Sequence, residues 1–231
     1  SKTVAIGRGA LTAQNFTSAT DSHNTAVGFN AGGSVTNGTQ NTIMGSDAGD
    51  AITDGTGNSC FGKEAGSNVT TGGNNLLLGH DAGITGSPGG NITTGSHTIV
   101  LGDENITSFN CQVALTVASD ERDKTEFSDL NLGLEFVKSL EPVTYYWDRR
   151  SSYGDKEAED YDLSAQTPDG THKEDWMDVG FKAQSVLALE EAAGHTISDK
   201  KNLTVSLSED GKQYGLQYEK FVPILVKAIQ E

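Results

Sequence analysis

The chain has 231 residues and a formal net charge of −16, with 28 glycines but only 4 prolines. This acidic balance argues against binding to nucleic acid or to an anionic membrane, because both demand a basic surface. No apolar run approaches the ~18 residues of a membrane-spanning helix, so we expect no membrane insertion. Hydrophobic residues make up only 35%, which favours repeats or an oligomer whose neighbours share one core. The chain starts at Ser1 without methionine, so we expect it to be a piece of a longer protein.

The N-terminal half is built from a repeat of 17 residues. Each copy starts with asparagine, continues with three mostly apolar or small residues and ends with glycine; the copies are 24–28, 41–45, 58–62 and 75–79. A second pair, a β-branched residue followed by threonine, stands at 35–36, 52–53 and 69–70, and shifts to 92–93 in the fourth unit. We therefore predict two short strands per unit, each followed by a glycine turn, in coils that stack around one core.

The polar residues of the repeat fit the same stack. We expect the repeated asparagines to satisfy backbone groups in turns or along the stack, and Cys60, in a slot otherwise held by apolar residues, to be a small buried hydrophobe. A disordered glycine-rich linker is the alternative, and the fixed spacing argues against it. Because we see no fixed place for Asp47, Asp50, Asp54 and Asp81 in the repeat, we expect no calcium site.

Over residues 3–105 these units resemble the head repeats of trimeric autotransporter adhesins, whose Asn-Ser/Thr-x-x-Gly coils form a left-handed parallel β-roll. Similar repeats occur in phage tail fibres. The unit here is longer than the usual adhesin unit. It therefore stays open whether each coil is formed by one chain or by three interlocked chains.

The periodicity changes after the repeats. Alternating apolar residues predict a strand over 106–117, and helical spacing predicts a helix over 129–140, capped by Ser128 or Asp129 and ended by Pro142. Further elements are expected in this order: a strand at 143–147, a surface excursion at 148–178, a helix opening at 178–184 and ending before Gly194, a hairpin of 202–207 and 212–218, and a helix at 218–231. The last helix has an apolar face too broad for a lone surface helix, so we expect it to pack against copies of itself.

Four motifs follow one another in the second half: Ser119-Asp120-x-Arg122-x-Lys124, Leu-x-Pro-Val-x-Tyr-x-Trp at 140–147, Val-Gly-Phe-x-Ala-Gln at 179–184, and the segment 218–231. In this order they resemble the C-terminal intramolecular chaperone domain of phage tail spikes and fibres, the S74 peptidase family. The resemblance covers 119–231 and implies a homotrimer in which this domain guides folding of the fibre upstream and then releases itself by autoproteolysis. The expected fold is a parallel β-roll or β-helix, trimeric, at 1–118, followed by an α+β chaperone domain at 119–231.

The resemblance implies that Ser119 and Lys124 are the catalytic pair, with Asp120 and Arg122 in support and Ala118 next to the cleaved bond. A serine hydroxyl needs a base, and a lysine amine is a base only when neutral, against an ordinary pKa of ~10.4. Arg122 could act as a like charge beside the amine, or as partner to an oxyanion or a carboxylate. The side of Ser119 that is cut stays open.

This sequence departs from the family pattern at Asp123, where an apolar residue is usual. A carboxylate beside Lys124 favours the protonated amine, which is no base, so we expect slow or conditional cleavage. Nothing else suggests catalysis, because the five histidines lack metal-ligand spacing and no phosphate-binding glycine motif is present. We expect no metal and no cofactor.

Two functions of different class follow. The first is the C-terminal part of a phage tail fibre or spike, assembled in the host cytoplasm, carried on the virion and self-cleaving once without turning over external substrate. The second is a trimeric structural or adhesive fibre with a trimerisation module that never cuts. In either case the fibre could contact a host receptor or glycan. A glycan-degrading spike lacks support, because no paired catalytic carboxylates stand out in these residues.

Overall fold

The computed structural model describes residues 2–156, 158 and 160–231. The chain forms two compact units that are each assembled from separate segments. The first unit combines residues 1–106, 147–174 and 207–213, and the second combines 107–146, 175–206 and 214–231. Two segments of the C-terminal half thus belong to the same compact unit as the repeats. The division into domains at residues 118 and 119 stays a prediction.

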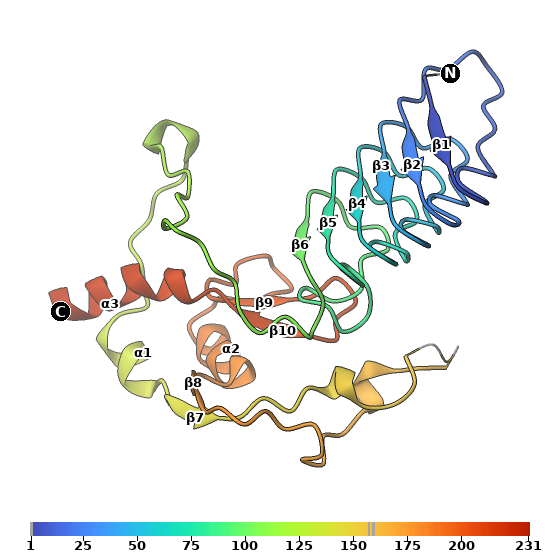
Figure 1. The fold of residues 1–231 in the computed structure, drawn as a ribbon. Coiled ribbons are helices and arrows are strands. Elements are labelled where there is room, and N and C mark those ends of the chain that lie inside the picture. The colour runs from blue at the N-terminus through green and yellow to red at the C-terminus, as the bar shows by residue number, and fades with distance from the viewer. Residues whose placement is uncertain (1, 157, 159) are drawn as a thin grey trace. The chain divides into compact units, whose positions relative to one another are not determined.

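The repeats form a parallel β-solenoid with one strand per coil (Figure 1). Its strands are β1 (Val4–Ile6), β2 (Thr25–Val27), β3 (Thr42–Met44), β4 (Ser59–Phe61), β5 (Leu76–Leu78) and β6 (Ile99–Leu101). Each pairs with the next in parallel, so that a residue of β2, β3 or β4 lies opposite the residue 17 positions later. This confirms the predicted fold class, a parallel solenoid over residues 4–101 followed by a mixed α+β region with a C-terminal helix.

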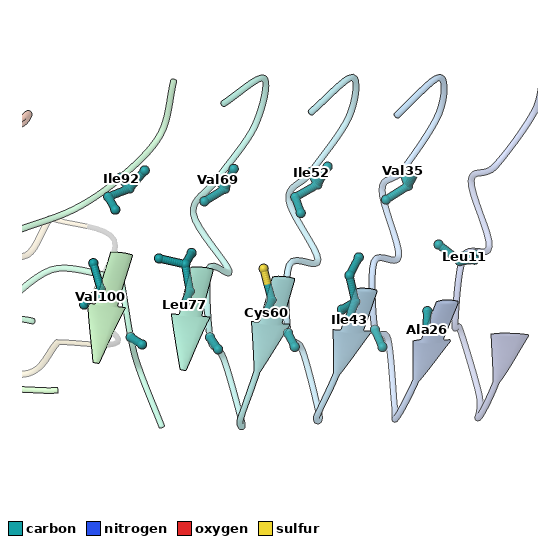
Figure 2. Close-up of a cluster of buried hydrophobic side chains, with 14 residues drawn as sticks. Leu11, Ala26, Val35, Ile43, Ile52, Cys60, Val69, Leu77, Ile92 and Val100 are labelled. Atoms are coloured by element: carbon teal, nitrogen blue, oxygen red, sulfur yellow. The ribbon is translucent and has the colours of Figure 1, made fainter. Parts of the chain in front are cut away.

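Two facing rows of side chains form the larger part of the solenoid core (Figure 2). Fully buried alanines at positions 31, 48, 65 and 82 complete it. One row comes from the middle of strands β2 to β6 and the other from the return segments of the coils. The rows are Ala26, Ile43, Cys60, Leu77, Val100 and Leu11, Val35, Ile52, Val69, Ile92. Cys60 is fully buried, as predicted. A three-residue strand cannot bury a face alone, so the contacts between coils provide the hydrophobic stabilisation.

The repeated asparagines form a ladder inside the stack. Asn41 donates from its side chain to the carbonyl of Gly55 (2.8 Å), and its side-chain oxygen accepts from the backbone N–H of Asn58 (2.9 Å). Asn58 repeats both contacts one coil later, with Gly72 and with Asn75. Each buried amide therefore satisfies backbone groups of its own coil and the next, as expected from the sequence.

The predicted second strand of each coil does not form. In the coil that contains Val35, the backbone N–H groups of Thr36 (3.0 Å) and Gly38 (3.1 Å) both donate to the carbonyl of Thr53. Two donors that converge on one acceptor replace the alternating bonds of a ladder, so the segment is a turn. Its β-branched side chain still faces the core, which explains why the sequence pattern resembled a strand.

The corner after each strand requires glycine. Gly45 has a φ of +143°, and a Cβ atom there would overlap the carbonyl oxygen of Gly62 in the next coil. Gly28 stands in the same relation to Gly45. Both the backbone conformation and the spacing of successive coils therefore exclude a side chain at this corner.

The predicted surface excursion at 148–178 is more ordered than expected. It contains the 3₁₀ turns η2 (Arg150–Ser152) and η3 (Leu163–Ala165), and Leu163 is only 1% exposed. Ion pairs join Arg149 to Glu174 and Lys156 to Glu104. The segment 147–174 therefore belongs to the compact first unit, although its described residues contain no long helix or strand.

The C-terminal half contains three helices and two small sheets among its described residues. In chain order they are η1 (Glu121–Asp123), α1 (Leu134–Ser139), β7 (Val143–Tyr145), β8 (Asp178–Gly180), α2 (Ala183–Ala192), β9 (Val205–Leu207), β10 (Tyr214–Leu216), η4 (Tyr218–Lys220) and α3 (Phe221–Gln230). β7 pairs antiparallel with β8, and β9 pairs with β10. The core of the second unit is formed by Leu132, Phe136, Val186, Val205, Phe221 and Ile224. In the described part of the chain no helix is long and apolar enough to span a membrane.

Three sequence predictions need correction here. The helix expected over 129–140 begins only at Leu134, because the carboxylate of Glu231 accepts the Leu134 N–H (2.7 Å) in place of a cap at Ser128 or Asp129. The segment 178–180 is strand β8 rather than the start of a helix, because it pairs with β7. The strand expected over 106–117 is absent, since no described segment pairs with it. The predicted helix stop at Gly194 is confirmed by its φ of +90°.

Candidate functional site

Ser119 and Lys124 lie in direct contact. The amine Nζ of Lys124 is 2.6 Å from the Ser119 hydroxyl Oγ and 3.3 Å from the Ser119 carbonyl oxygen. The single 3₁₀ turn η1 stands between them and reverses the chain, with the Lys124 N–H donating to the carbonyl of Glu121 (3.1 Å). The turn therefore brings two side chains that are five residues apart in the sequence within hydrogen-bond distance of each other.

Asp120 and Arg122 hold this turn. The Asp120 carboxylate caps it by accepting the Arg122 backbone N–H (2.9 Å), and it also accepts from Nε (3.0 Å) and Nη2 (2.6 Å) of the same arginine. Hydrogen bonding to Arg122 lowers the pKa of Asp120, and the same side-chain bond raises the pKa of Arg122. The sequence left open whether Arg122 acts as a like charge beside the amine or as a partner to an oxyanion or a carboxylate. In the structure its guanidinium contacts a carboxylate, that of Asp120.

Asp123, the residue that departs from the family pattern, lies within η1. Within the described part of the chain no ion pair joins it to Lys124, whose amine contacts Ser119 instead. We expected the Asp123 carboxylate to favour the protonated amine of Lys124. In the single chain this effect does not act through a direct ion pair between the two side chains.

The whole segment around the pair is exposed. Every residue from 105 to 129 is accessible to solvent, including Ala118. Large apolar side chains share this exposure: Ile106, Phe109, Val113, Leu115, Val117 and Phe127. A run of apolar side chains in water is unusual for a finished surface and indicates that something covers it.

A second candidate element, which the sequence analysis treated only as a hairpin turn, lies at residues 208–213. The Glu209 carboxylate accepts from the backbone N–H of Thr94 (3.2 Å), from its hydroxyl (2.9 Å) and from the N–H of Gly95 (3.0 Å). Asp210 accepts the N–H of Asn91 (3.1 Å). In earlier coils, such groups bond to the following coil, as when the N–H of Gly55, at the repeat position of Gly95, donates to the Thr70 carbonyl (3.3 Å). Two carboxylates of the hairpin thus accept hydrogen bonds from backbone N–H groups of the last coil, as the carbonyl groups of a further coil would.

The prediction that the solenoid aspartates have no fixed place in the repeat needs correction for Asp47 and Asp81, though not for Asp50 and Asp54. Asp47, Glu64 and Asp81 stand two residues after successive corner glycines, and all three have a φ between +54° and +58°. The backbone N–H of each donates to the coil before it. Sequence alignment allowing glutamate as well as aspartate would have found this acidic row.

Asp50 lies beside the row and carries an unfavourable charge. Burial, together with the nearby Asp47 carboxylate, raises its pKa from 3.8 to about 6. The folded state therefore holds the Asp50 proton more tightly than the unfolded state does. The resulting stabilisation is complete below about pH 4 and is lost as the pH rises through about 6.

Replacing Asp50 by asparagine should therefore stabilise the solenoid at neutral pH. We expect a gain of about 1 kcal/mol in the free energy of unfolding at pH 7.5, after discounting for the half-exposed side chain, and no gain at pH 4. Thermal denaturation at both pH values measures it, with the exposed Asp54→Asn as the matched control. A gain of equal size at the two pH values would show that the charge of Asp50 is not its source.

One comparison with known proteins gives a match. The family model for Peptidase S74, described as the chaperone of endosialidase, matches residues 119–195. No curated protein and no solved structure matches the chain. The matched region begins at Ser119, directly at the Ser119–Lys124 contact, and residues 196–231 lie beyond it.

Proposed function

We propose that this chain, in which a β-solenoid precedes a Peptidase S74 chaperone-of-endosialidase domain at residues 119–195, is the C-terminal part of a phage tail fibre or spike. Residues 119–231 drive homotrimerisation and folding of the solenoid and then release themselves by a single self-cleavage at Ser119. The observation that carries the proposal is the 2.6 Å contact between Ser119 and Lys124 at the first residues of the matched domain.

The contact supplies the two groups that acyl transfer needs. A neutral Lys124 amine accepts the hydroxyl proton of Ser119, and Oγ attacks the carbonyl carbon of Ala118 through a five-membered ring. The Ser119 nitrogen leaves as the amine after gaining a proton, so that an ester joins Ala118 to Ser119. Water then hydrolyses the ester and leaves a carboxylate on Ala118.

A second route cuts on the other side. Attack by Ser119 on its own carbonyl needs a four-membered ring, so this route uses water, activated by Lys124, at the Ser119–Asp120 bond. The Lys124 amine also lies 3.3 Å from the Ser119 carbonyl oxygen, where a protonated amine stabilises negative charge on that oxygen. Each route leaves a different first residue on the C-terminal fragment.

Assembly supplies a reason for the timing of cleavage. Lysine becomes neutral more readily when it is removed from water, and the segment 105–129 is fully exposed in the single chain. Copies of the chain that cover the apolar residues of this segment would also desolvate the pair. Cleavage would then follow assembly and make it irreversible.

The hairpin at 208–213 supports the chaperone role. It belongs to the part of the chain that cleavage would release, and its carboxylates cap backbone donors of the last coil. Pairing short parallel coils is a slow, non-local event. A preformed element that offers acceptors to the last coil gives the solenoid an end from which to grow.

Self-cleavage is tested on a denaturing gel with mass spectrometry of the full chain after expression. We expect a fragment of residues 119–231 or 120–231 from the native sequence and an uncut chain from Ser119→Ala and from Lys124→Ala. Asp123→Leu should speed cleavage, and Lys138→Ala, a change at an exposed lysine on α1, should leave it unchanged. The mass of the fragment decides which bond breaks.

An uncut chain in every sample would contradict the peptidase role and favour the alternative, a trimeric structural or adhesive fibre whose C-terminal module never cuts. The chaperone role has its own test, since light scattering should give three chains per particle for Ser119→Ala. On this proposal the protein is carried on the virion after assembly in the host cytoplasm, and its fibre contacts a host receptor or glycan.

A further inference from the structure

The last two corners of the solenoid bring three metal-ligating side chains together. His80 and Asp81 follow strand β5, and Asp103 follows strand β6. The imidazole Nδ1 of His80 lies 3.2 Å from Asp81 Oδ1 and 3.6 Å from Asp103 Oδ2. Ligands with bonds of ~2.0–2.2 Å in a tetrahedral zinc site lie ~3.3–3.6 Å apart. Both separations from His80 Nδ1 are close to the edges of such a site, and all three ligand atoms lie within 4.8 Å of one another.

The surroundings resemble those of a bound ion. Asp81 Oδ1 is fully buried and makes no hydrogen bond within the described residues, a costly state for a carboxylate oxygen. Asp103 is oriented by Asn105, whose backbone N–H (3.0 Å) and side-chain amide (2.9 Å) donate to its two oxygens. Metal-ligating carboxylates are typically held by such outer hydrogen bonds.

The local charge also favours a cation. Two carboxylates, those of Asp81 and Asp103, face a single imidazole here, while Glu64 is paired with Lys63. A divalent ion between them would neutralise both charges and contact the unsatisfied oxygen.

We propose that His80, Asp81 and Asp103 bind one divalent transition-metal ion, with zinc as the best match to one imidazole nitrogen and two carboxylate oxygens. The remaining coordination position is open to water. The ion joins the corner after β5 to the corner after β6, which are separated by the longest coil of the regular stack. Because all three ligands precede Ser119, the site stays with the solenoid whether or not the chain is cleaved.

The test is calorimetric titration of the full chain, free of any histidine tag, with zinc chloride. We expect one zinc ion per chain, at least a tenfold loss of affinity in His80→Ala and in Asp103→Asn, and weaker binding of calcium. His80 is half exposed, so its removal opens no core. Asp47→Asn at the equivalent repeat position and His97→Ala, at another exposed histidine, are the matched controls.

Hydrogen exchange gives a second readout. Saturating zinc should slow amide exchange in residues 99–105 by about tenfold, because a ligand that binds only the folded state suppresses local opening. A chain that binds no zinc, or one that keeps full affinity in both His80→Ala and Asp103→Asn, overturns the site. In that case His80 serves only as a charge partner of the two aspartates. Neither result bears on self-cleavage at Ser119.

Discussion

Replacing Gly45 by alanine should abolish folding of the solenoid or reduce its free energy of unfolding by at least ~4 kcal/mol, a size reserved for core or backbone failures. The new methyl group would overlap the carbonyl oxygen of Gly62. A φ of +143° is, in addition, accessible almost only to glycine. Relief would require the two coils to separate, and this would break the β3–β4 pairing on which the core depends. Circular dichroism and thermal denaturation of the full chain measure the loss.

Gly57 provides the matched control. It also has a positive φ, +75°, but a Cβ atom there would lie 3.7 Å from its nearest neighbour, the backbone nitrogen of Asn74. Gly57→Ala should therefore cost only the left-handed backbone strain, ~1–2 kcal/mol. Equal losses from the two substitutions would show that backbone strain, rather than the close approach of coils, sets the requirement for glycine.

Replacing Glu209 by alanine should expose the end of the solenoid. Its carboxylate accepts two backbone N–H groups and one hydroxyl from Thr94 and Gly95, and hydrogen bonds to charged groups make a net contribution of ~1.5–3 kcal/mol each. At this exposed position we expect a total loss of ~2 kcal/mol. Hydrogen exchange should show faster exchange at residues 91–98 and unchanged exchange at the middle coils.

The control for this experiment is Glu191→Ala, a change at an exposed glutamate on α2. This substitution removes the same charge, but from a residue of the second compact unit. If Glu209→Ala left the amides of Thr94 and Gly95 as protected as in the native chain, the hairpin would not be a cap. If exchange rose but the yield of assembled trimer from the Ser119→Ala background stayed the same, the cap would stabilise the last coil without guiding assembly.

The stack of coils was predictable from the sequence because its determinants are local and repeated. Corner glycines every 17 residues, a buried apolar position such as Ile43 and an asparagine before each strand recur together, and a single chain of such units has few alternatives to stacking. The second strand was wrongly predicted for an instructive reason. Val35 faces the core as a strand residue would, but burial does not require a ladder of hydrogen bonds.

The errors in the C-terminal half come from partners far apart in the chain. The start of α1 depends on Glu231, and strand β8 depends on β7, more than thirty residues earlier. No local signal at residues 128–134 or 178–180 reveals either contact. Alternation at 106–117 predicted a strand, but a strand needs a neighbour, and the described residues of the single chain provide none.

For the candidate site, the pairing of Ser119 with Lys124 came from the family resemblance of the four motifs in the second half, because the spacing of these two residues is a weak pattern by itself. The sequence was not enough to choose the role of Arg122, which depended on the geometry of Asp120. The His80, Asp81 and Asp103 group was missed, since Asp103 stands 22 and 23 positions after the other two and meets them only after β5 and β6 are paired.

The asparagine ladder gives the solenoid a direction and a unit of length. Each side chain offers an acceptor to the next coil, and the series ends when Asn75 accepts the backbone N–H of Thr98, where no further asparagine follows. Every internal interface is therefore interchangeable with its neighbour. A fibre of this kind can be lengthened or shortened during evolution by whole 17-residue coils, in steps of ~4.8 Å, while both of its ends keep their own contacts.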